Sequence, residues 1–128
     1  MSKNLFALLV LGGVITFLLV ACATTSADSS SAPNQVHMNT TDFVSSSITI
    51  KKGERITLID DTLTSHIIAN GIWENGTAKP TREPGAPEVK DVQINGFSQG
   101  TIGPFTIAGA FHLYCTIHSG MNLIIIVQ

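Results

Sequence analysis

Short runs of alternating apolar and polar residues, separated by turn signals, fill the chain from residue 36 onward. In the run RITLID, residues 55–60, the side chains of Ile56, Leu58 and Asp60 share one face of a predicted strand. Other β-prone runs lie at 47–50, 65–69, 91–94, 104–108, 110–115 and 122–128. None of this part has helical spacing of apolar residues. The pattern predicts an all-β domain, an antiparallel sandwich or barrel.

Three details of the pattern predict how the strands are arranged. The Asn70-Gly71 pair is expected to end the strand at 65–69. The stretch 72–91, which contains three prolines, is expected to be a long irregular loop. The run at 123–127 is apolar at nearly every position, which predicts a central, well-covered strand.

The N-terminus has a different pattern. Lys3 is followed by the apolar run LFALLVLGGVITFLLVA, which is typical of a secretory signal, although an uncleaved membrane anchor is the alternative. The end of this run and the residue after it, Leu19-Val20-Ala21-Cys22, resemble the lipobox of bacterial lipoproteins. The resemblance implies that the signal peptide, 1–21, is removed and that Cys22 carries lipid. The protein is then expected to be extracytoplasmic and lipid-anchored to the cell membrane.

A polar segment at 22–35 is predicted to be a disordered tether, because it has no aromatic or large aliphatic residue to bury. The folded domain is therefore expected at 36–128. The chain has seven Lys and Arg against nine Asp and Glu, a net charge of −2, and loss of Lys3 would make it −3. No cluster of basic residues is present, so nucleic acid is not an expected partner.

The chain has two cysteines. If Cys22 is lipidated, Cys115 has no partner for a disulfide in an oxidising compartment. Such a thiol is either buried and inert or bound to something.

The segment CTIHSGM, residues 115–121, favours a bound metal. Cys115, His118 and Met121 are spaced three residues apart, and Gly120 allows a tight turn, so the three side chains can converge. His66, in the run at 65–69, is the natural fourth ligand. Thiolate and thioether are soft donors that select copper, and two histidines, one cysteine and a weak methionine form the pattern of blue-copper electron-transfer sites. Four protein ligands leave no open position for a substrate, so an enzyme is not expected.

The segments KKGE-RITLIDD and FHLYCTIHSGM, each placed before or around these candidate ligands, resemble the cupredoxins of the plastocyanin and amicyanin group. The resemblance covers about 36–128 and implies a Greek-key β-sandwich with one copper ion that alternates between Cu(I) and Cu(II). It assigns His66 as the first imidazole ligand, Cys115 as the thiolate, His118 as the second imidazole and Met121 as the axial thioether. Many members have Asn directly after the first histidine, where this chain has Ile67.

The resulting hypothesis is a monomeric electron carrier at the outer face of a membrane, which exchanges electrons through His118 with transient redox protein partners. The main alternative is an extracytoplasmic copper-binding chaperone or scavenger with the same ligands. A copper oxidase or reductase would need a further copper centre, and the sequence has no His-x-His pair. A sandwich without metal is the remaining alternative.

Overall fold

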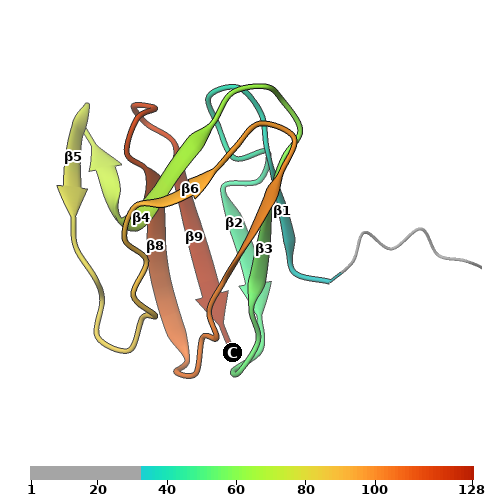
Figure 1. The fold of residues 1–128 in the computed structure, drawn as a ribbon. Helices are drawn as coiled ribbons and strands as arrows, with labels where there is room; N and C mark the ends of the chain where they lie inside the picture. Colours follow the sequence, from blue (N-terminus) through green and yellow to red (C-terminus); the bar gives the residue numbers. More distant parts are fainter. Residues whose placement is uncertain (1–32) are drawn as a thin grey trace, which may run out of the picture.

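The computed structural model describes residues 33–128, so the predicted signal peptide and Cys22 lie outside the described residues. Two β-sheets pack face to face in this part (Figure 1). The strands are β1 (Gln35–Met38), β2 (Ser47–Ile50), β3 (Ile56–Asp60), β4 (His66–Glu74), β5 (Thr77–Pro80), β6 (Val92–Ile94), β7 (Gln99–Ile102), β8 (Gly109–Cys115) and β9 (Asn122–Val127). Among residues 33–128 no helix is long and apolar enough to cross a membrane.

The strands form a three-stranded sheet and a six-stranded sheet. One sheet has the order β1-β3-β7, and the other has the order β2-β9-β8-β4-β5 with β6 also paired to β4. Most pairs are antiparallel, but β1 is parallel to β3 and β2 is parallel to β9. The predicted Greek-key β-sandwich is confirmed. The sandwich was expected to be antiparallel, and two of its strand pairs are parallel, because turn signals mark where strands end and not which distant strand each one joins.

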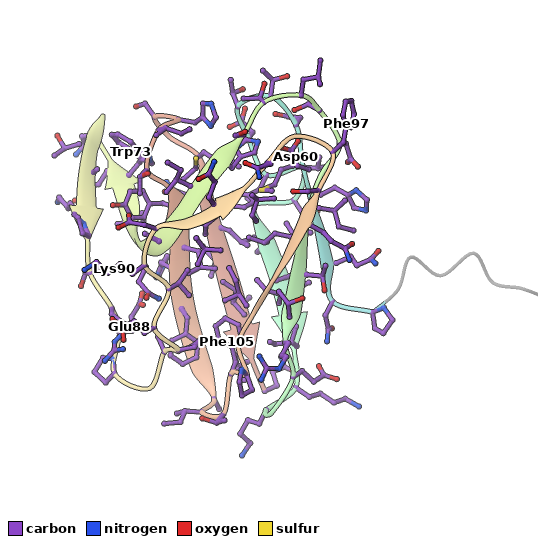
Figure 2. All side chains as sticks on the ribbon, in the orientation of Figure 1. Asp60, Trp73, Glu88, Lys90, Phe97 and Phe105 are labelled. Carbon is purple, nitrogen blue, oxygen red and sulfur yellow. The ribbon has the colours of Figure 1, made fainter. Side chains whose placement is uncertain are left out.

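Period-2 alternation directs one face of each central strand into the space between the sheets. On β3 the buried positions are Ile56, Leu58 and Asp60, and on β8 they include Phe111, Leu113 and Cys115. The buried set on β3 matches the face predicted for that strand. Phe105, labelled in Figure 2, is fully buried at the end of the core remote from the β8–β9 turn.

The predicted strand end at Asn70-Gly71 was wrong, because β4 continues to Glu74 and pairs with β5. Gly71 has φ +137°, and a Cβ there would lie 2.5 Å from the carbonyl oxygen of Lys79. The glycine therefore permits close approach of β5 instead of forming a turn. Within the predicted loop, the turn at 75–76 and the later part, 81–91, lack strand structure.

Two other expectations also need correction. No strand forms at 104–108, because Phe105 bonds through its main-chain N–H and C=O to the turn at Gly53 and Glu54. Strand β9 is central, between β2 and β8, but it is covered on one face only: Ile124 and Ile126 are 36% and 38% exposed. An uninterrupted apolar run does not show whether another layer covers its second face.

Candidate metal centre

The candidate ligands gather at one end of the sandwich, where the β8–β9 turn and the start of β4 lie together (Figure 1). Cys115 ends β8 and is paired with Ile68 on the neighbouring strand β4. His66 is two residues before Ile68 and therefore points to the same, inner face. The register of β4 against β8 thus brings an imidazole to the thiol across 49 residues of sequence.

Three donor atoms converge. The Nδ1 atom of His118 lies 3.3 Å from Sγ of Cys115 and 3.2 Å from Nδ1 of His66. Donor atoms of all three residues lie within 4.8 Å of one another. Metal–nitrogen and metal–sulfur bonds of about 2.0–2.3 Å place the donors around one ion roughly 3.3–3.8 Å apart. The spacing and the chemistry of the donors therefore fit a single metal ion.

The turn that carries the other ligands is closed by its own main chain. The N–H of Cys115 donates to the carbonyl of Met121 (3.1 Å), and the N–H of Met121 donates to the carbonyl of His118 (3.2 Å). Gly120 has φ +84°, which the turn requires. Met121 is fully buried at the base of this turn. Its predicted role as the axial thioether stays a prediction.

The environment of His66 favours the neutral imidazole. Burial, the largest effect, lowers the pKa of His66 below its ordinary value, and the nearby His118 lowers it further. The carboxylate of Asp60 and the main chain of Asn39 act in the opposite direction with smaller effect. Because a metal binds the unprotonated nitrogen, the lowered pKa keeps the residue ready for binding.

Trp73 is a bracing residue that the sequence did not reveal. It lies on β4, not in a loop as expected, and its indole Nε1–H donates to the carbonyl of Cys115 at 2.8 Å (Figure 2 shows its position). The Asn122 side chain holds the main chain of Trp73 on both sides: Oδ1 accepts from its N–H at 2.7 Å and Nδ2 donates to its carbonyl at 3.0 Å. These bonds join β4 to both ends of the turn. No local pattern could have indicated contacts over 42 and 49 residues.

Asp60 is the second residue that sequence reasoning did not assign to the site. It ends β3 in the opposite sheet, and its Oδ2 atom lies 3.8 Å from Nε2 of His66, with both side chains fully buried. A signal for it did exist, because Asp60 shares strand parity with the core residues Ile56 and Leu58. A carboxylate at an inward position needs a partner.

The chain's other two histidines lie outside the cluster. His37 bonds to Asp61 at 2.7 Å, and His112 bonds to Glu83 at 2.5 Å. Ile67 follows His66 where the resemblance to cupredoxins predicts Asn, and its carbonyl accepts from the N–H of Thr116 at 2.8 Å. This main-chain bond links β4 to the turn without the side chain.

Comparison with known proteins identifies the fold. No protein-family model and no curated protein sequence matches the chain. Among solved structures it is similar to amicyanin from Paracoccus versutus, with 19% identity, coverage of 73% of this chain and 79% of that chain, and a TM-score of 0.56. A purple cupredoxin from Nitrosopumilus maritimus has 17% identity, coverage of 73% and 98%, and a TM-score of 0.56. A mutant amicyanin in its reduced Cu(I) form has 17% identity, coverage of 73% and 80%, and the same TM-score. The domain has the cupredoxin fold.

Proposed function

We propose that this domain binds one copper ion through His66, Cys115, His118 and Met121 and transfers single electrons at the outer face of a membrane. The observation that carries the proposal is the convergence of one thiol sulfur and two imidazole nitrogens within 4.8 Å. Soft and borderline donors in this combination select copper. Solved relatives of the same fold are a cupredoxin and an amicyanin in its Cu(I) form.

A copper ion bound there would supply the one-electron chemistry by alternating between Cu(I) and Cu(II). The chain's contribution is to hold the donor atoms where they are. Cys115 and His66 sit on paired strands, and the turn is fastened to β4 through Thr116 and to itself through Met121. A site held from several directions changes little when its charge changes, which favours fast electron exchange.

His118 is the proposed point of electron exchange. It is partly exposed, whereas His66 and Cys115 are buried. Its neighbour Ile117 is 53% exposed, and Leu63 and Phe97, at 83% and 68%, lie in the adjoining β3–β4 and β6–β7 loops. Exposed apolar side chains at this end of the domain suit brief, close docking with redox protein partners. Lipidation of Cys22 would keep such a monomer beside membrane-bound partners at high local concentration.

The burial of the ligands favours a carrier over a copper chaperone or scavenger. A chaperone passes its ion on by exchanging ligands with the acceptor, so its donors need to be reachable. Here His66, Cys115 and Met121 have no exposed surface. Only His118 is accessible from outside.

Titration of the metal-free protein with Cu(II) tests the proposal. We expect one equivalent to bind with an intense visible band from thiolate-to-copper charge transfer, and Cys115→Ser to lose the band. Repeated reduction and reoxidation should leave the copper bound. Absence of the band in the unmodified protein would exclude the proposed site, and loss of copper on reduction would favour the chaperone.

A further inference from the structure

Two buried polar atoms face each other behind the metal centre without a hydrogen bond. Asp60 Oδ2 and His66 Nε2 have no hydrogen-bond partner among residues 33–128 and are 3.8 Å apart, and neither side chain has exposed surface. Leaving a buried polar atom unpaired costs about 1–3 kcal/mol, and more for a charged group. The pair is therefore either a costly defect or an interaction that tightens when the site is occupied.

The carboxylate is already oriented toward the imidazole. Its other oxygen, Oδ1, accepts from the N–H of Thr62 at 2.9 Å and from the Thr62 hydroxyl at 3.0 Å. The Asp60 main chain is also fixed, because its N–H donates to Ser98 at 2.9 Å. With Oδ1 occupied, Oδ2 is the oxygen that points at His66. Figure 2 shows Asp60 at the ligand-bearing end of the sandwich, on the sheet opposite His66.

The two nitrogens of His66 have different surroundings. Nδ1 faces His118 at 3.2 Å within the donor cluster, whereas Nε2 faces Asp60. In a neutral imidazole one nitrogen carries the proton and the other has the free lone pair. A carboxylate acceptor beside Nε2 favours the proton there, so Nδ1 is left free to bind a metal.

We propose that Asp60 is a positioning residue for the metal centre: its Oδ2 accepts the proton of His66 Nε2, fixes the tautomer with Nδ1 free, and keeps a negative charge behind that ligand. This proposal rests on the copper function proposed above. The buried negative charge stabilises Cu(II) more than Cu(I) and therefore lowers the reduction potential. The competing acceptor is the main-chain carbonyl of Asn39, which also lies near His66.

Asp60→Asn separates these two acceptors. In Asp60 one oxygen faces Thr62 and the other faces His66, but the amide of the variant has only one acceptor oxygen. Its NH2 group must therefore face the donor of either Thr62 or His66, and that donor loses its acceptor. Asp61→Asn is the matched control, because Asp61 is the next residue, loses the same charge, and bonds to His37 with both side chains exposed. If Asp60→Asn does not fold, Thr62→Val provides a second test by removing one donor that orients the carboxylate.

The first measurement uses the metal-free protein and nitrogen-15 NMR of the histidine rings. We expect His66 to be protonated at Nε2 in the unmodified protein and in Asp61→Asn, and to become a tautomer mixture in Asp60→Asn and, to a smaller extent, in Thr62→Val. The second measurement is the potential of the copper form. Asp60→Asn should reduce the preference for Cu(II) over Cu(I) at least tenfold, a rise of at least 59 mV for one electron, several times the change in Asp61→Asn.

An unchanged His66 tautomer and potential in Asp60→Asn would overturn the proposal and identify the Asn39 carbonyl as the acceptor. The NMR result needs no copper. A protein that fails to bind copper would therefore disprove the proposed function, while the role of Asp60 in fixing the tautomer would still be decided.

Discussion

Replacing Asn122 by Ala tests whether the Trp73 brace stabilises the domain. The Asn122 amide takes the place of a peptide group, since its Oδ1 and Nδ2 atoms bond the N–H and C=O of Trp73 at 2.7 and 3.0 Å. Beyond Asn70 the pairing of β4 with β8 stops, so this edge of Trp73 has no strand partner among the described residues. A hydrogen bond of this kind contributes about 1 kcal/mol net, so the two together contribute about 2 kcal/mol. For a domain of this size that equals a fall in melting temperature of roughly 8–16 °C.

Urea unfolding of the metal-free protein, followed by circular dichroism, measures this loss. Gln93→Ala is the matched control, because it removes one exposed side-chain hydrogen bond, to Asn95 at 2.9 Å. We expect the control to change the free energy of unfolding by less than about 0.5 kcal/mol. An Asn122→Ala protein as stable as Gln93→Ala would refute the idea that the amide replaces a missing strand.

Three further predictions concern pH, packing and electron exchange. Burial lowers the pKa of His66, so as pH falls below about 6.5 this histidine takes up a proton in the unfolded chain before it does so in the folded domain. The metal-free domain should therefore lose up to about 1.4 kcal/mol of stability per pH unit from this residue. In urea titrations over the same pH range, a His66→Gln protein should lose less stability. Gly71→Ala should destabilise the domain by more than about 3 kcal/mol, because the added methyl group would meet the main chain of β5. Gly53→Ala is the control: Gly53 also has a positive φ but has open space around it, so the loss should be about 1–2 kcal/mol. Equal melting temperatures of the two variants would contradict the claim that close packing at Gly71 matters. Ile117→Lys should slow electron self-exchange, measured by NMR line broadening, at least tenfold without altering the visible spectrum, whereas Ile126→Lys, on the open face of β9, should leave the rate within about twofold.

The candidate site was more predictable than the strands around it. Cys115, His118 and Met121 share one turn, so their spacing alone predicted convergence, and two of them do converge with His66. The donor chemistry then allowed a metal to be inferred before any geometry was known. Met121 is in the same turn and buried, but its contact with a metal stays a prediction.

What could not be predicted depends on pairing between distant segments. Gly71 follows Asn70 in a dipeptide typical of turns, yet it lies within a strand because β5 folds back against it. Trp73 and Asn122 meet only because β4 lies beside the β8–β9 turn. Asp60 reaches His66 from the opposite sheet, and only strand parity indicated that it points inward. These are tertiary contacts, and a local sequence pattern does not indicate which distant strand or sheet will pack against a residue.

The central position of β9 determines when the domain can form during synthesis. This strand comes after all the other described strands in the chain, yet it lies between β2 and β8 and joins them into one sheet. A nascent polypeptide that emerges N-terminus first therefore cannot complete that sheet until residue 127 has left the ribosome. The candidate donors at 115 and 118 precede β9 by only a few residues, so the sheet and the candidate metal centre are completed at nearly the same point of synthesis.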